Sequence, residues 1–209
     1  MNFWGSNISW LLLVITIFVD FIFPFVLSLF YHGYNNMNHV ISLLGNPKSP
    51  VANIFKIWMI SMGILFCISA INFYIVYYPI SHLLSSIGTV MLLTFGISTC
   101  VIGGIFSLDE EKKLNTVSSL IHGIGAGIGF LALSFVPLIL SLISFKSNNT
   151  TTGVISIVCF VLSILFVILF ILSEKYFFKK PIVCFNGLWQ RLLLISSYIP
   201  LLLIANNFL

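Results

Sequence analysis

Apolar residues run along this chain in six long blocks, and polar residues and prolines interrupt them. An α-helix needs about 20 mostly apolar residues to cross a hydrocarbon core of roughly 30 Å, and each block meets that length. The blocks are too long for membrane barrel strands and lack their alternation. The pattern therefore predicts an all-α, polytopic transmembrane bundle of six helices within a single domain covering residues 1–209. The spans are expected at about 8–31, 51–78, 83–106, 117–145, 154–173 and 188–208.

The composition supports a lipid environment for these blocks. Hydrophobic residues make up 59% of the 209 residues and charged residues only 7%, against about a quarter charged in soluble domains. A soluble globule of this size cannot bury so much apolar surface. The net charge is +4, but the basic residues are scattered and form no stripe of the kind that binds nucleic acid. We therefore expect the lipid bilayer as a partner and no nucleic acid.

The basic residues also predict an orientation. When the chain alternates through six helices, both termini lie on a side that carries Lys146 alone. Lys and Arg resist translocation, so the side that collects them is expected to be cytoplasmic and both termini extracytoplasmic. The residues on the basic side are Lys48, Lys56, Lys112, Lys113, Lys175, Lys179, Lys180 and Arg191.

An ionisable side chain inside a span costs a few kcal/mol and is by default a candidate for function. Counted back from Tyr31 at about 1.5 Å per residue, Asp20 lies roughly 16 Å deep, close to the midplane. Pro24 has no N–H, so the backbone carbonyl of Asp20 loses its helical partner. This acid beside a free carbonyl can receive a cation, a proton or a ligand amine. The alternative is a protonated Asp that is hydrogen-bonded to a neighbouring helix.

A second group of polar residues is expected near the cytoplasmic face. His122 lies about 9 Å inside that face and Arg191 about 6 Å inside it, with Gln190 beside Arg191. The first long loop brings Ser42 and His39 to the same side, where acidic residues also lie, so these groups can converge on one pocket. The alternative for Arg191 is that it extends to the interface as a single cation. The ligand-binding candidates are Asp20, Ser42, Asp109, His122, Gln190 and Arg191.

Metal and nucleophile chemistry have weaker patterns. His32, His39 and His122 are weak metal candidates, because no two of them form an H-x-x-x-H pair on one helix face. The four cysteines form no C-x-x-C pair. We predict no metal and no cofactor. Ser42, His39, Asp109 and His122 can be assigned as nucleophile, base and orienting groups, but no G-x-S-x-G or other specific motif accompanies them.

Four glycines lie at alternate positions early in the fourth block: Gly123, Gly125, Gly127 and Gly129. Small residues at this spacing allow the backbones of two membrane helices to approach closely. We expect them to serve helix packing, with a cavity lined by backbone as the alternative.

Several short segments together carry a resemblance to a known family. They are Ile41–Gly45, Gly103–Phe106 followed by Asp109, His122–Gly123, and Gly187–Arg191. At these residues the chain resembles the uncharacterised prokaryotic multi-pass membrane family called domain of unknown function 998. The resemblance implies a six-helix protein of a bacterial or archaeal inner or plasma membrane and supplies no activity. It implies Ser42, Asp109, His122 and Arg191 as a candidate pocket.

Three functions are compatible with these observations. The first is binding or transport of a small ligand, a lipid headgroup or a proton through a polar pocket that faces the cytoplasm. The second is an intramembrane lipid hydrolase or transferase, which the lack of a specific motif disfavours. The third is a structural, partner or immunity-type membrane protein. Alternating-access transport at this chain length would require a homodimer.

Overall fold

The structure is a computed structural model that describes residues 3–108, 116–174 and 185–209. Within these ranges the chain is all-helical and has no strand, as predicted. The elements are α1 (Asn7–Ser28), the 3₁₀ helix η1 (Ile41–Gly45), α2 (Ala52–Tyr77), α3 (His82–Thr94), the π-helix η2 (Phe95–Val101), α4 (Ile102–Ile105), α5 (Val117–Lys146), α6 (Thr150–Glu174) and α7 (Asn186–Asn206).

Six helices in the described ranges are long and apolar enough to cross a membrane. Because α3, η2 and α4 follow one another without a break, they form one span over His82–Ile105. The predicted spans agree with the observed ones to within a few residues. The largest difference is at α6, which begins at Thr150 rather than at the predicted Val154. The six-helix prediction is therefore confirmed.

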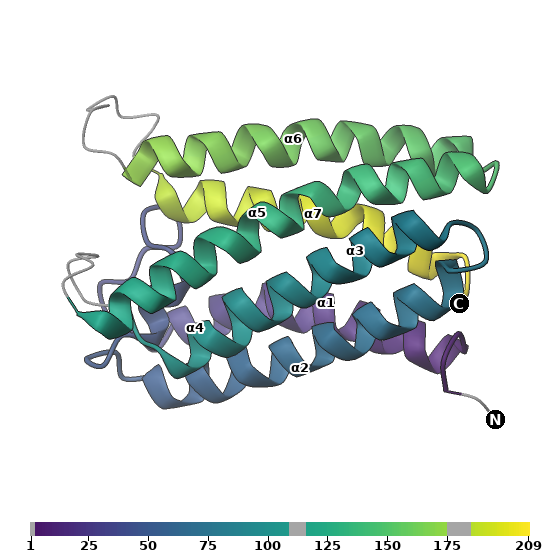
Figure 1. Cartoon of the computed structure of the whole chain (residues 1–209). Helices are drawn as coiled ribbons and strands as arrows, with labels where there is room; N and C mark the ends of the chain where they lie inside the picture. Colours follow the sequence, from purple (N-terminus) through teal and green to yellow (C-terminus); the bar gives the residue numbers. More distant parts are fainter. Residues whose placement is uncertain (1–2, 109–115, 175–184) are drawn as a thin grey trace.

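Consecutive helices pack side by side, and α7 returns to pack against α1, which closes the bundle. Because α7 also contacts α5, α6 lies on the outside of the bundle and packs mainly on these two helices. Figure 1 shows both chain termini at the same end of the bundle. We call this the terminal end; it also carries the turns at 78–81 and 147–149. The opposite end carries the long segment 29–51, and we call it the loop end.

Local chemistry explains how α5 begins and ends. Thr116 caps its first turn, because the Thr116 hydroxyl accepts a hydrogen bond from the backbone N–H of Ser119. After Lys146 the chain reverses at Asn148, which has a φ of 59°, a left-handed conformation that Asn tolerates better than most residues. This short reversal brings α6 directly against α5 at the terminal end.

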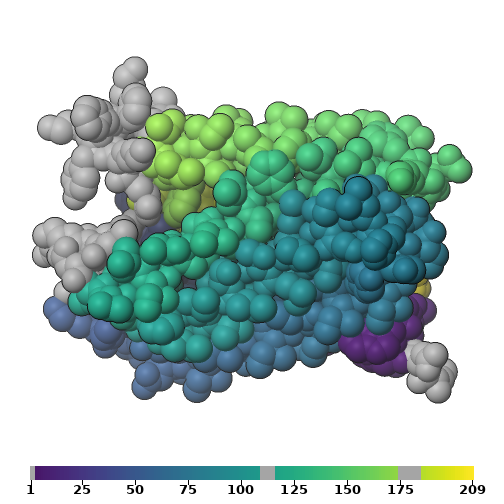
Figure 2. Space-filling model, in the orientation of Figure 1, coloured from purple at the N-terminus to yellow at the C-terminus, as the bar shows by residue number. Residues whose placement is uncertain are grey.

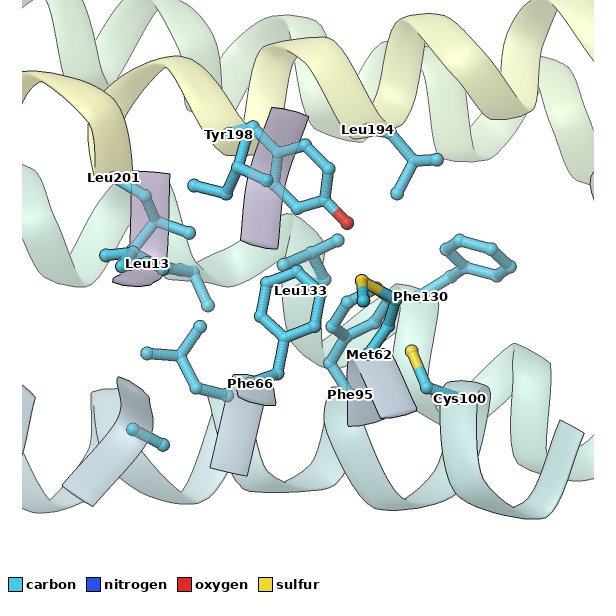
Figure 3. Packing of buried hydrophobic residues seen from close by; sticks show 14 of the residues in the cluster. Leu13, Met62, Phe66, Phe95, Cys100, Phe130, Leu133, Leu194, Tyr198 and Leu201 are labelled. Carbon is cyan, nitrogen blue, oxygen red and sulfur yellow. The ribbon is translucent and has the colours of Figure 1, made fainter. Parts of the chain in front are cut away.

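The core of the terminal half is closely packed. Trp10 is fully buried and its ring stacks on Phe208 with the ring centroids 4.6 Å apart. Leu140 and Leu201 are also fully buried. Toward the middle of the bundle, Phe66, Phe95 and Leu133 surround Tyr198, whose hydroxyl is the one oxygen among the side chains drawn in Figure 3. Apolar packing thus fills the bundle from the terminal end to its middle.

Candidate functional site

A cavity of about 450 Å³ lies in the half of the bundle toward the loop end. This volume is within the range of about 300–1,000 Å³ that is usual for small-molecule sites. Most of its wall is apolar, with Phe55, Phe130 and Val167 among the lining residues. Polar side chains interrupt this wall: Asp20, Ser42, Trp58, Thr99, His122 and Gln190. An apolar cavity with a few convergent polar groups is the usual form of a ligand site.

Asp20 is buried, with 5% of its surface exposed, and it lies on α1 four residues before Pro24. Its Oδ2 accepts a hydrogen bond of 2.6 Å from the hydroxyl of Tyr198 on α7. The carboxyl group therefore has the partner on a neighbouring helix that we considered as the alternative, and it also lines the cavity. Its role as a ligand site stays a prediction.

His122 projects from α5 into the wall of the same cavity and is 4% exposed. Its Nδ1 lies 2.8 Å from the carbonyl oxygen of Phe106, at the end of α4. A carbonyl oxygen can only accept, so Nδ1 carries the hydrogen, and in a neutral ring Nε2 is left as an acceptor. The last residues of the third span thereby fix the orientation of the imidazole.

Ser42 lies in η1 and Gln190 lies in α7, and both line the cavity although they are far apart in sequence. The Gln190 side-chain oxygen accepts a 2.7 Å hydrogen bond from the backbone N–H of Ile41, and this bond fastens η1 to α7. Ser42, the next residue of η1, lines the cavity together with Ile41 and Gln190. The loop that follows α1 therefore forms one wall of the site.

Arg191 is buried next to this wall but is not among the residues that line the cavity. Its guanidinium donates to the backbone carbonyls of Asn36, His39 and Gly187, at 2.7, 3.2 and 2.9 Å. It also donates to the Asn36 side-chain oxygen and to the hydroxyl of Tyr34, at 2.7 and 3.1 Å. In the described part of the chain no carboxylate pairs with it. Arg191 thus holds the 29–51 segment in place.

Tyr34 belongs to this arrangement and lies outside the membrane-spanning helices. Burial raises the pKa of its hydroxyl above the ordinary value, and the Arg191 guanidinium beside it opposes that shift. Gly187 makes room for the loop, because a Cβ at this position would collide with the carbonyl oxygens of Asn36 and His39. Gly187, Gln190 and Arg191 thus bind the first loop together.

Two further polar groups of the cavity wall were not predicted. The indole N–H of Trp58 and the hydroxyl of Thr99 are buried, and neither has a hydrogen-bond partner among the described residues. Thr99 lies in the π-helix η2, and π-helical turns inside α-helices are frequent at functional sites. Buried polar groups are normally paired, and these two atoms, which have almost no accessible surface of their own, are exceptions.

Tyr198 was also missed, although the sequence contained a signal for it. It follows Gln190 by eight residues, so both lie on the same face of α7. Leu194, which lines the cavity, lies between them on this face. A search for ionisable residues that are charged at neutral pH passes over a tyrosine in an apolar helix.

The glycines of α5 divide into two pairs. A Cβ at Gly125 would lie 2.7 Å from the Ser98 carbonyl oxygen, and one at Gly129 would collide with the Thr99 hydroxyl. These two glycines allow α5 to pack closely on η2. Gly123 and Gly127 instead line the cavity. The packing interpretation therefore applies to one pair and the cavity interpretation to the other.

The remaining candidates lie elsewhere. Asp109 is outside the described residues. His32 and His39 line a separate small cavity of about 130 Å³ at the loop end, and the Nδ1 of His39 accepts the backbone N–H of Asn35 at 3.0 Å. Ser42 and His39 thus line different cavities. Among the described residues, no group of three His, Cys, Asp or Glu side chains could hold a metal ion.

A comparison with known families gives a match over most of the chain. The model of a family described as "Protein of unknown function (DUF998)" matches residues 14–206, which is nearly the whole chain. The resemblance that the short segments indicated is thereby confirmed. No curated protein and no solved structure matches the chain.

Proposed function

The chain belongs to the DUF998 family, and from this premise and the cavity we propose that the protein binds a small amphipathic molecule inside the membrane. In this proposal the polar part of the ligand lies at Asp20 and His122, and its apolar part lies along the wall of the cavity. Binding of this kind serves either a receptor or a transporter of the ligand.

The cavity with its buried polar wall is the observation that carries the proposal. Asp20, His122 and Gln190 are each at most 5% exposed, yet all three line a space of about 450 Å³. Polar groups buried in an apolar bundle cost free energy. A structural role alone is served better by closer packing, so their position around a space favours a ligand.

The proposal is tested by looking for a bound molecule in the protein as it is purified from its own membrane. Native mass spectrometry of the wild-type protein is expected to show an added mass at near-stoichiometric occupancy. Asp20→Asn and His122→Ala are expected to lower that occupancy, because each removes a polar contact. His82→Ala is the matched control, since His82 is exposed at the terminal end and does not line the cavity.

A variant that fills the cavity separates loss of binding from loss of folding. Ala126 lines the cavity and is partly buried. Ala126→Phe is expected to exclude the ligand while the protein still elutes as a single folded species. A wild-type protein without any added mass, or equal occupancy in Ala126→Phe and wild type, would contradict the proposal.

We further propose that the loop end, and with it the cavity, is on the cytoplasmic side. The uneven distribution of Lys and Arg along the sequence supports this orientation. Lys48 is exposed at the loop end and Lys146 is exposed at the terminal end. In a chain without its native cysteines, Lys146→Cys should react with an impermeant maleimide on intact cells, whereas Lys48→Cys should react only after permeabilisation. The opposite labelling pattern would reverse the orientation.

A further inference from the structure

The cavity is not enclosed on all sides, because its lining residues differ widely in exposure. Asp20 and His122 are nearly inaccessible, at 5% and 4% exposed. Ile124, Leu131 and Ile171 line the same cavity and are 54%, 51% and 49% exposed. A single space therefore extends from the buried polar groups to the outer surface of the bundle.

This opening lies between α5 and α6. The lining residues of α5 follow one helical stripe that includes Gly123, Gly127 and Leu131, and those of α6 are Val167, Phe170 and Ile171. Near the terminal end the two helices are in close contact, since a Cβ at Gly153 would meet the Phe145 ring at 2.7 Å. Toward the loop end they diverge, and α7 is visible between them (Figure 1). Figure 2 shows the surface hollowed between α5 and α6 in the same region.

Gly127 lies at the edge of this opening. A Cβ added there would meet no atom within 4 Å, in contrast to Gly125 and Gly129, where a Cβ would collide with η2. Gly127 is also exposed. The position without a side chain on α5 therefore faces open space, and a large side chain at Gly127 would narrow the entrance without disturbing the core.

The opening is at membrane depth. At a rise of about 1.5 Å per residue, Gly127 lies about 15 Å along α5 from its first residue and Leu131 about 21 Å. Both belong to a helix that is long and apolar enough to span the bilayer. A molecule that reaches the cavity through this opening comes from the lipid phase.

The polar wall restricts the head of such a molecule. No Lys or Arg is among the described residues that line the cavity, so none of these residues supplies a cation to offset repulsion between an anionic head and the Asp20 carboxyl group. Asp20 and the Nε2 of a neutral His122 can accept hydrogen bonds from such a head. A head with hydroxyl or amine groups and no negative charge matches this set.

We infer that the ligand is a bilayer lipid with a hydroxyl or amine head and no negative charge, and that it enters the cavity sideways between α5 and α6. This inference rests on the proposed function and specifies its ligand class and its route of entry. The acyl chain extends through the opening past Gly127 while the head reaches Asp20 and His122.

The head group is tested with three lipids that share an 18-carbon chain with one cis double bond, each added to the full-length protein in nanodiscs. Monooleoylglycerol carries hydroxyls, oleylamine carries an amine, and oleoyl lysophosphatidate carries a phosphate. At least one of the first two is expected to bind about tenfold or more tightly than lysophosphatidate, and the tighter of the two identifies hydroxyl or amine as the preferred donor. Equal or tighter binding of lysophosphatidate would overturn the ligand class.

The route is tested with Gly127→Leu and a control on the same helix. Ile128→Phe enlarges an exposed side chain that does not line the cavity. Gly127→Leu is expected to slow the binding of the preferred lipid by about tenfold or more, and Ile128→Phe to leave the rate within about twofold. An unchanged rate in Gly127→Leu would overturn the lateral route.

These outcomes are separable from failure of the proposed function. If the purified protein carries a bound mass that Ala126→Phe excludes, but none of the three lipids displaces it, the lipid inference fails and the ligand-binding function stands. If the wild-type protein carries no bound mass and binds none of the three lipids, both fail.

Discussion

The two halves of this bundle use the same six helices in different ways. In the terminal half the helices are joined by short turns, and side chains such as Trp10, Leu140 and Leu201 are fully buried against their neighbours. In the loop half α5 and α6 diverge, a cavity of about 450 Å³ remains, and polar groups such as Asp20 and His122 line it. The terminal half therefore holds the helices together, and the loop half contains the cavity.

Both halves bury polar groups, some with a hydrogen-bond partner and some without one among the described residues. In the terminal half the hydroxyl of Thr16 is bonded to the carbonyl of Leu12 within its own helix, at 2.7 Å. Buried groups without a partner among the described residues occur in both halves: the Thr99 hydroxyl and Trp58 indole N–H in the loop half, and the Trp10 indole N–H and Ser141 hydroxyl in the terminal half. Unpaired groups therefore do not distinguish the halves, whereas the polar side chains around the cavity do.

The largest expected effect is that of Arg191→Ala, which tests whether the loop half depends on the hydrogen bonds of this one side chain. The substitution removes five hydrogen bonds from a cation to the 29–51 segment and to α7. We expect a loss of about 3 kcal/mol or more in the free energy of unfolding, measured by titration from lipid–detergent micelles into a denaturing detergent. Hydrogen exchange of residues 34–45 should rise most. Arg191→Lys keeps the positive charge but loses the planar guanidinium, so its free energy of unfolding should lie between those of the wild type and Arg191→Ala. Unchanged hydrogen exchange of residues 34–45 in Arg191→Ala would show that Arg191 does not hold this loop.

The next effect compares packing in the two halves directly. Leu201→Ala, in the closely packed half, is expected to cost about 2–4 kcal/mol because it leaves a cavity among fully buried neighbours. Leu131→Ala, at the opening between α5 and α6, is expected to cost less than about 1 kcal/mol because half of that side chain already faces lipid. The same unfolding titration measures both. Similar costs at the two positions would show that the halves do not differ in packing.

A smaller effect is expected from the hydrogen bond that joins the two regions. Tyr198→Phe removes the hydroxyl that donates to Asp20 and should lower the free energy of unfolding by about 1–2 kcal/mol. A double-mutant cycle with Asp20→Asn isolates the pair. If the two substitutions are additive, the 2.6 Å contact contributes nothing to stability.

The smallest effect is expected at the unpaired hydroxyl. Thr99→Val should change the free energy of unfolding by less than about 0.5 kcal/mol in the ligand-free protein, because the hydroxyl has no partner in the described part of the chain. Thr16→Val is the control from the terminal half and should cost about 0.5–1 kcal/mol, because it loses the bond to Leu12. A larger loss of stability at Thr99 than at Thr16 would show that the Thr99 hydroxyl does make a stabilising hydrogen bond.

The spans could be predicted because hydropathy dominates in a membrane: a block of about 20 apolar residues has few alternatives to a helix. Asp20 and His122 could be predicted as candidates for a related reason, since an ionisable side chain inside a span is costly. The structure then brings both to one cavity with Ser42 and Gln190.

The partners of Arg191 and the unpaired groups of the cavity wall could not be predicted, because they depend on how distant parts of the chain are placed in space. Arg191 was singled out for its charge, but most of its partners belong to a loop about 150 residues away in sequence: two backbone carbonyls, an amide oxygen and a tyrosine hydroxyl. The unpaired state of Trp58 and Thr99 depends on how η2 and α2 are placed relative to α5. The prediction for Asp109 stays a prediction, because that residue lies outside the described ranges.

The π-helix makes the length of the third span matter as much as its chemistry. A π-helical turn holds one more residue than an α-helical turn, so deleting any one residue within Phe95–Val101 would let the segment close into an ordinary α-helix. Everything after it would then keep its orientation about the helix axis, because the shortened turn still closes one revolution. A deletion in the α-helical part of the span, such as His82–Thr94, would instead rotate the residues after it by about 100°. The Phe106 carbonyl would then turn away from His122 although neither residue had been altered.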